Sequence, residues 1–99
     1  AVGPDGAAQA ISIYLNGQLI IIMTYFVYLL LSSRDNKYYI GYTSSMNKRL
    51  KEHNAGLVTS TRSRRPFELI GYEQYETESK ARWTEHQLKN SAHKRNKFI

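Results

Sequence analysis

The stretch Tyr25–Thr43, YFVYLLLSSRDNKYYIGYT, decides the fold. It opens with an aromatic and branched apolar run without helical periodicity, YFVYLLL, and closes with a second such run, KYYIGYT. The residues between them, SSRDN, are turn formers. Apolar runs of this kind, bounded by turn formers, are typical of strands. We therefore expect an antiparallel hairpin.

Two tyrosines of this hairpin, Tyr28 and Tyr39, are separated by eleven positions. If the connecting loop has an even number of residues, antiparallel pairing places both side chains on the same face of the sheet, because side chains alternate along a strand. Taken alone, tyrosines on a half-buried strand more often serve packing than chemistry. Their neighbours in the fold decide between these two interpretations.

A helix is predicted directly after the hairpin. Ser44 or Ser45 can cap its N-terminus, and Gly56 is a typical terminator after Asn54. Its buried edge is predicted to consist of Met46, Leu50 and Leu57.

Arg49 and His53 are four residues apart on this helix, so they stack one turn above the other beside the apolar edge. Without the tyrosines, such a pair is more often an exposed helix flank than a site. With them, a cation and an imidazole face the same place.

The rest of the chain is predicted to add a loop, one more strand and two helices. Residues 58–66, VTSTRSRRP, read as a loop, and residues 67–75, FELIGYEQY, as a third strand. Thr77 is predicted to cap a helix through about Asn90, and Ser91 a short terminal helix. The prediction is an α/β (α+β) fold with a small three-stranded antiparallel sheet flanked by helices, in the order β-β-α-β-α-α. Trp83 is expected to anchor the core or its edge.

Residues 1–22 are interpreted as an appendage to a domain spanning residues 23–99. Residues 1–10 are Gly-, Pro- and Ala-rich and resemble a leader or tag, and Met23 is a candidate native start. In residues 11–22, branched runs flank Asn16-Gly17, which favours a β-hairpin. The apolar run at residues 19–31 is too short for a bilayer span, so no membrane association is expected.

Composition and charge limit the classes of binding partner and site that this protein can have. A chain of 99 residues fits one domain. The net charge is +6 and the isoelectric point about 9.7, which suggests an anionic partner such as nucleic acid. All 14 Lys and Arg residues lie after Met23. The absence of cysteine excludes disulfides and thiolate zinc sites and fits a cytoplasmic location. The oligomeric state is left open.

Glu85 places a carboxylate in the middle of an otherwise apolar helical stripe. Ala81, Thr84 and Leu88 are its neighbours on the face expected to pack on the sheet. An unpaired buried charge costs several kcal/mol, so something must compensate it. A salt bridge to Arg49 is one solution. A divalent cation, Mg²⁺ or Mn²⁺, bound by one carboxylate and several waters, is the other.

Five pieces of the sequence, in this order, resemble the GIY-YIG nuclease family. They are Phe26-Val27-Tyr28, Tyr39-Ile40-Gly41, Arg49 and His53 within RLKEH, and Glu85 within ARWTEHQLK. The resemblance spans residues 24–99 and is closest to small stand-alone bacterial members related to the UvrC nuclease domain and to a DNA resolvase. The first triplet reads Phe-Val-Tyr in place of Gly-Ile-Tyr, which keeps the tyrosine.

The resemblance implies a metal-dependent endonuclease that hydrolyses DNA phosphodiester bonds, with structure-selective cleavage in DNA repair or recombination as a further expectation. Tyr28 would orient or deprotonate the attacking water with Tyr39 beside it, and Arg49 would neutralise the scissile phosphate. His53 would assist proton movement, and Glu85 would hold Mg²⁺ or Mn²⁺. Asn90 and Asn96 are the two candidates for the late asparagine of the family.

The DNA-contacting residues are expected among the basic clusters. Phosphate contacts position a duplex without reading its sequence. The candidates are Arg62, Arg64, Arg65, Lys94 and Arg95. An alternative function is a DNA-binding module that keeps the nuclease scaffold but has little activity alone, because so small a domain offers limited surface for DNA.

Overall fold

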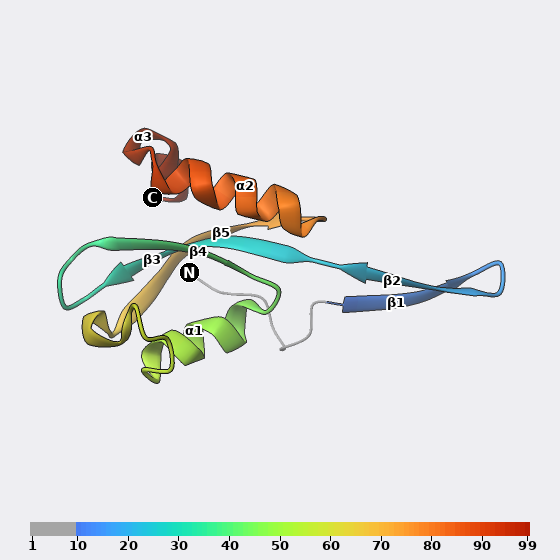
Figure 1. The fold of residues 1–99 in the computed structure, drawn as a ribbon, viewed down its shortest axis with the longest axis horizontal. Coiled ribbons are helices and arrows are strands. Elements are labelled where there is room, and N and C mark those ends of the chain that lie inside the picture. The colour runs from blue at the N-terminus through green and yellow to red at the C-terminus, as the bar shows by residue number, and fades with distance from the viewer. Residues whose placement is uncertain (1–9) are drawn as a thin grey trace.

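The computed structural model describes residues 10–99. The elements are β1 (Ala10–Leu15), β2 (Gln18–Met23), β3 (Tyr25–Ser32), β4 (Tyr38–Thr43), α1 (Met46–Asn54), η1 (Arg62–Arg64), β5 (Phe67–Tyr75), α2 (Glu78–Lys89), α3 (Ala92–Arg95) and η2 (Asn96–Phe98), where η denotes a short 3-10 helix. Strands β4, β3 and β5 form an antiparallel sheet in that order, with α1 on one face and α2 with α3 on the other (Figure 1). The predicted α+β fold is confirmed.

The β3–β4 register decides which side chains share a face. Tyr28 pairs with Gly41, and Leu30 pairs with Tyr39. The loop at residues 32–37 thus has an even number of residues, and the Tyr28 and Tyr39 side chains lie on the same face, as predicted. Their ring centroids are 6.3 Å apart.

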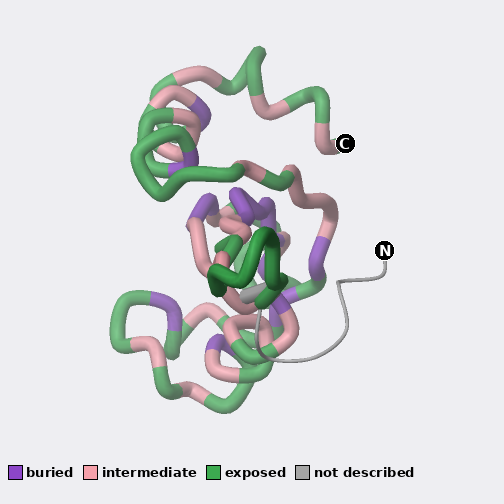
Figure 2. Tube along the Cα trace, turned by 90° about the vertical axis from the view of Figure 1, so that its right-hand side faces the viewer, coloured by how far each residue is buried: buried purple, intermediate pink, exposed green. Residues whose placement is uncertain are grey.

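Strand β3 is apolar or aromatic from Tyr25 to Leu31, as suits a central strand that is covered on both sides. Phe26, Tyr28 and Leu30 pack towards α1, where Met46 is fully buried. Val27 and Leu29 pack towards α2. Figure 2 shows the buried positions concentrated in the layer between the helices. The sheet therefore separates two small cores, and the tyrosines belong to the one beneath α1.

Helix α1 ends as predicted but begins differently. Gly56 has φ +80°, the left-handed conformation that terminates helices. Ser45 occupies the N-cap position, yet its hydroxyl does not cap; Thr43 Oγ1 instead accepts a hydrogen bond from the Ser45 N–H at 3.0 Å. The buried position predicted for Leu57 is wrong: the turn at Gly56 directs this side chain outward, and it is 73% exposed.

The second half of the chain follows the predicted boundaries closely. Thr77 accepts a hydrogen bond from the Lys80 N–H, and Ser91 accepts one from the Lys94 N–H, so both serve as N-caps. The anchoring position expected for Trp83 is wrong. Helical geometry places Trp83 on the side of α2 opposite the buried Ala81, and the indole is 62% exposed.

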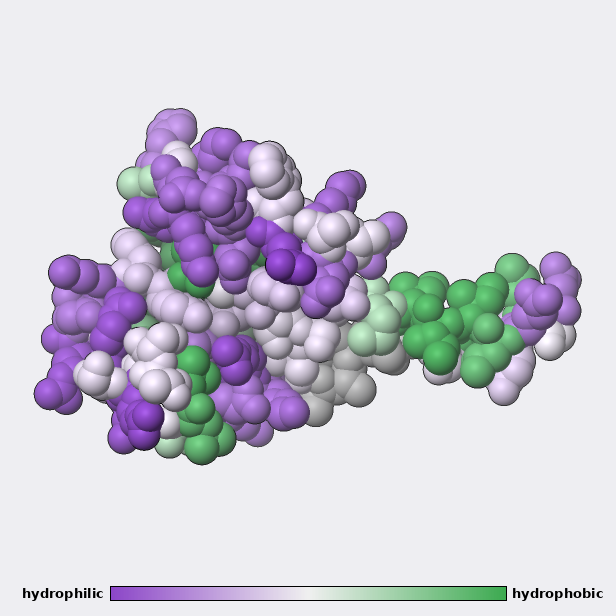
Figure 3. Space-filling view, viewed as in Figure 1, coloured by the Kyte–Doolittle hydropathy of each residue, from purple (hydrophilic) through white to green (hydrophobic). Residues whose placement is uncertain are grey.

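Strands β1 and β2 form a separate two-stranded sheet that projects from the domain (Figure 1). Asn16 and Gly17 have φ values of 51° and 76°, which suit a two-residue turn. Figure 3 shows this projection as a hydrophobic arm beside a largely hydrophilic domain. Of the leader predicted over residues 1–10, residues 1–9 lie outside the described part of the chain. Among the helices within residues 10–99, none is long and apolar enough to cross a bilayer.

Candidate functional site

Tyr28 lies at the centre of the site because its cross-strand neighbour has no side chain. A methyl group on Gly41 would overlap the Tyr28 ring, with Cζ only 2.5 Å from the Cβ position. The ring therefore leans across β4 into space that only glycine leaves open, and Tyr28 is 1% exposed. The role of Gly41 went unrecognised in the sequence, although a glycine inside a strand often marks such a close approach.

His53, in the last turn of α1, meets the Tyr28 hydroxyl. The Tyr28 oxygen is 2.9 Å from His53 Nε2, and Thr61 Oγ1 is 2.8 Å from His53 Nδ1. His53 and Thr61 are both fully buried. Thr61 also escaped sequence analysis, because its position in a hydroxyl-rich loop does not distinguish it from Thr59, Ser60 or Ser63.

The protonation of His53 follows from its surroundings. Burial, together with the positive charge of Arg49, lowers its pKa to about 4, against the opposing effect of Glu52. The neutral ring has one donor and one acceptor nitrogen. The Thr61 hydroxyl is directed at the Val58 carbonyl at 3.5 Å, which leaves its oxygen to accept from Nδ1–H. Nε2 is then the acceptor for the Tyr28 O–H.

The Tyr28 phenol is also neutral in the free protein. Burial raises its pKa, and the neighbouring Tyr39 and the negative charge of Glu85 act in the same direction. The Arg49 guanidinium beside the phenol opposes this shift without overcoming it. Any process that removes the Tyr28 proton therefore needs more positive charge than the free protein supplies, or a partner that accepts the proton.

Arg49 and Tyr39 complete the cluster on this face. The Arg49 side chain is 35% exposed, and Nη1 lies 3.3 Å from Glu52 Oε1. The Tyr39 ring is 5.1 Å from the His53 ring, centroid to centroid. The structure thus brings together all four residues expected to be catalytic. The Arg49 side chain is partly exposed to solvent, and Tyr28 and His53 are buried beneath it.

Glu85 approaches from α2, on the other face of the sheet. Its side chain is 19% exposed and pairs with Lys89 at 3.4 Å. Of the two forms of compensation left open by the sequence, the salt bridge to Arg49 is not formed, since Arg49 pairs with Glu52. The charge of Glu85 nevertheless contributes to the raised pKa of Tyr28. The carboxylate thus comes from the α2 face of the sheet, whereas the Tyr28 phenol lies on the α1 face.

The basic residues expected to contact DNA occupy two regions. Arg62 and Arg65 are exposed near the C-terminal end of α1, whereas Arg64 is held in the fold. The Arg64 guanidinium donates to Asp35 at 2.5 Å and to the carbonyls of Lys37 and Tyr38. This contact lowers the pKa of the Asp35 carboxyl to about 2.

The second region lies on the opposite face of the sheet, at α3. Lys94 Nζ donates to Gln87 at 2.8 Å, and Arg95 Nη1 donates to the Leu88 carbonyl at 2.8 Å. Asn90 donates to the His86 carbonyl at the end of α2, and Asn96 begins η2. The hydrogen bonds described for residues 10–99 link neither asparagine to Tyr28 or His53.

Comparison with known proteins identifies the family of this domain. The family model of the GIY-YIG catalytic domain matches residues 24–98. UPF0213 protein lwe0147 of Listeria welshimeri is 41% identical over 68 residues, covering 68% of this chain and 76% of the relative. UPF0213 protein RBAM_000440 of Bacillus velezensis is 41% identical over 73 residues, covering 73% of each.

A solved structure is also similar to this chain. The solution NMR structure of UPF0213 protein BH0048 from Bacillus halodurans has 31% sequence identity and a TM-score of 0.48, and covers 76% of this chain and 81% of that one.

The fold and the family match together define a GIY-YIG catalytic domain, and the chain belongs to the GIY-YIG family. Within that family, its relatives are the small UPF0213 proteins. The resemblance found in the sequence is thereby confirmed.

Proposed function

We propose that this protein is a metal-dependent DNA endonuclease whose active site is built on Tyr28, Tyr39, Arg49, His53 and Glu85. The observation that carries the proposal is the buried hydrogen-bonded series from Tyr28 through His53 to Thr61, with Arg49 at its solvent side. A series of this kind can relay a proton between the Tyr28 hydroxyl and the His53 ring. Family membership and a net charge of +6 support DNA as the substrate.

Hydrolysis requires that a water lose a proton as its oxygen bonds to phosphorus and the bond to the leaving oxygen breaks. The Tyr28 oxygen takes the proton from water while its own proton passes to His53 Nε2. Thr61 holds the imidazole in the acceptor orientation. The leaving oxygen finally takes a proton from solvent, and His53 returns its extra proton through Tyr28, which restores the starting protonation state. Arg49 neutralises charge that develops on the phosphate oxygens.

The residues fit a single divalent cation of the magnesium type. Within residues 10–99, no three His, Asp or Glu side chains converge as a complete metal cage. Mg²⁺ does not need one, since it often binds one or two carboxylates, substrate phosphate and water. Glu85 would hold it, exchanging the exposed Lys89 for the metal. A bound Mg²⁺ or Mn²⁺ would supply positive charge beside the scissile phosphate and favour ionisation near Tyr28.

Cleavage of supercoiled plasmid in Mg²⁺, with EDTA as the blank, tests the proposal. Tyr28→Phe should reduce the nicking rate at least about 100-fold, because it removes the group that takes the proton, while DNA binding measured in EDTA stays unchanged. Tyr72→Phe is the matched control, since Tyr72 packs against the same core and is not part of the buried series.

Full nicking activity in Tyr28→Phe would overturn the assignment of this residue. Binding without cleavage in the parent protein would favour the alternative function, a DNA-binding module on the nuclease scaffold. A panel of branched, damaged, single-stranded and duplex DNA would then establish which structure is cut, including whether the activity suits repair or recombination.

A further inference from the structure

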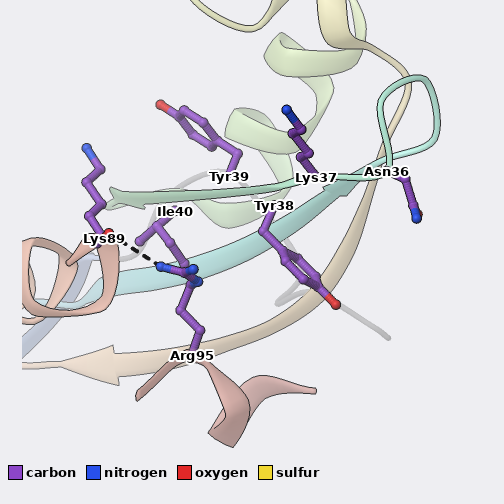
Figure 4. Close-up of a pocket in the computed structure, with 7 residues that line it drawn as sticks. All are labelled: Asn36, Lys37, Tyr38, Tyr39, Ile40, Lys89 and Arg95. Carbon is purple, nitrogen blue, oxygen red and sulfur yellow. Dashed lines mark hydrogen bonds between the residues drawn. The ribbon is translucent and has the colours of Figure 1, made fainter. Parts of the chain in front are cut away.

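A basic pocket of about 510 Å³ lies along the outer edge of β4, beside the candidate active site (Figure 4). Tyr38, Tyr39 and Ile40 of the strand form its floor. Three cations surround them: Lys37 at the start of the strand, Lys89 from α2 and Arg95 from α3. Of the residues described, no Asp or Glu lines the pocket. Its chemistry therefore suits an anion.

The cations approach this edge from both faces of the sheet. In Figure 4 the Lys37 and Tyr39 side chains extend to one side of β4, and Tyr38 and Ile40 extend to the other, towards Arg95. Arg95 is held in place, because its Nη1 donates to the Leu88 and Lys89 carbonyls at 2.8 and 3.4 Å. Part of the positive charge is thus positioned before any ligand arrives, which lowers the entropic cost of binding.

The pocket adjoins the candidate active site through two residues. Tyr39 lines the pocket, and its ring is 5.1 Å from that of His53, centroid to centroid. Lys89 lines the pocket and pairs with Glu85 at 3.4 Å. An anion in the pocket is therefore close to the candidate active site. A DNA strand carries a phosphate at every nucleotide, so one strand can supply an anion to each place.

We propose that this pocket binds backbone phosphates of the DNA strand adjacent to the phosphate that is cleaved, with Lys37 and Lys89 each contacting one of them. The inference rests on the proposed function in taking DNA as the ligand. It adds the path of the strand, which crosses the outer edge of β4 from Arg49 towards the loop at residues 32–37. Such a contact fixes position and does not read sequence.

The first test measures binding of a fluorescent duplex in EDTA over a range of salt concentrations. Lys37→Gln should lower the slope of log K against log salt by about 0.9, the value for one phosphate contact. This exposed side chain makes none of the ion pairs described for residues 10–99, so its replacement leaves the fold intact. Lys51→Gln, which removes an exposed lysine of α1 outside the pocket, should not change the slope.

The second test uses duplexes in which single linkages are replaced by uncharged methylphosphonates. Neutralising one particular linkage should weaken DNA binding by the parent severalfold. Neutralising the same linkage should not weaken binding by Lys37→Gln any further. The proposal would be overturned if Lys37→Gln and Lys51→Gln lowered the salt slope equally. It would also be overturned if every neutral linkage weakened binding as much in Lys37→Gln as in the parent. Binding of the mononucleotide dTMP as tightly as of DNA would also contradict it, because the pocket would then be a nucleotide site.

These measurements separate the two proposals, because neither requires cleavage. If the parent protein never cuts DNA but one linkage weakens binding only when Lys37 is present, the pocket proposal stands and the nuclease assignment is wrong. If the parent protein cuts DNA but no linkage depends on Lys37 in this way, the nuclease assignment stands and the pocket proposal is wrong.

Discussion

The protonation state of His53 decides which buried groups of the candidate site donate hydrogen bonds and which accept them. Its ring has no solvent exposure, and both nitrogens are within hydrogen-bonding distance of hydroxyl groups, of Tyr28 and of Thr61. A charged imidazole here would have to donate to both and would lose its hydration. The neutral ring is therefore the stable form, and its Nε2 accepts the hydrogen bond from the Tyr28 O–H.

The first prediction concerns the titration of His53. Its ring signals, followed by NMR, should shift with a midpoint near pH 4, well below the ordinary histidine value. Because the folded pKa lies below the unfolded one, the stabilisation due to the neutral ring is complete above about pH 6.5 and is lost as the pH falls towards 4. His53→Gln should flatten this part of the stability profile. A His53 midpoint near 6.5 would contradict the assigned neutral, buried state.

At the residue scale, sequence analysis brought together the four residues expected to be catalytic but missed two that support them. Tyr28 and Tyr39 were predictable as neighbours because strand alternation and hairpin pairing are regular. Thr61 was not, because its contact with His53 depends on the path of an irregular loop. The function of Gly41 depends on the tilt of a ring in the opposite strand, which no local pattern encodes.

At the scale of elements, β3, β4 and α1 carry Tyr28, Tyr39, Arg49 and His53, and Arg64 holds the loop after α1 against the β3–β4 turn. Arg64 links η1 to Asp35 and to the carbonyls at the start of β4. Arg62, two residues earlier in η1, is exposed. The strand and helix boundaries were predictable from caps and turn formers, whereas the division of labour within the Arg-rich loop was not. Three similar arginines differ only in what the fold places opposite them.

The second prediction follows from this difference between Arg62 and Arg64. Arg62→Ala should lower the salt dependence of DNA binding by one phosphate contact, a slope change of about 0.9, without changing the free energy of unfolding. Arg64→Ala should lower the free energy of unfolding by about 1 kcal/mol, because two carbonyls and a partly exposed carboxylate lose their donor. Urea denaturation and anisotropy titrations measure both. The reverse pattern would contradict the structural role of Arg64.

At the scale of the whole molecule, the domain and the projecting hairpin are built differently. Both core clusters are made of residues from Tyr25 onward. The described side chains of β1 and β2 are exposed, apart from the half-buried Ile20, and include Tyr14, Leu15 and Ile21 at 78, 57 and 59%. A two-stranded sheet is marginally stable by itself, and exposed apolar surface favours association.

The third prediction is that a chain of residues 23–99 folds without the hairpin. Its melting temperature should stay within a few degrees of the parent's, plasmid nicking should persist, and self-association measured by light scattering should fall. Loss of cooperative unfolding in the shortened chain would show that β1 and β2 support the domain, contrary to the separation of the two sheets.

The proposed active site combines a carboxylate from the α2 face of the sheet, Glu85, with a phenol on the α1 face, Tyr28. Glu85→Gln keeps the shape of the side chain and removes its charge. In single-turnover cleavage of labelled DNA with Mg²⁺, this variant should lose at least about 100-fold in rate, while binding DNA in EDTA as tightly as the parent or more tightly, because a negative charge near phosphate is gone. Cleavage by Glu85→Gln at the parental rate in Mg²⁺ would contradict the account, because the residue assigned to the metal would then be dispensable.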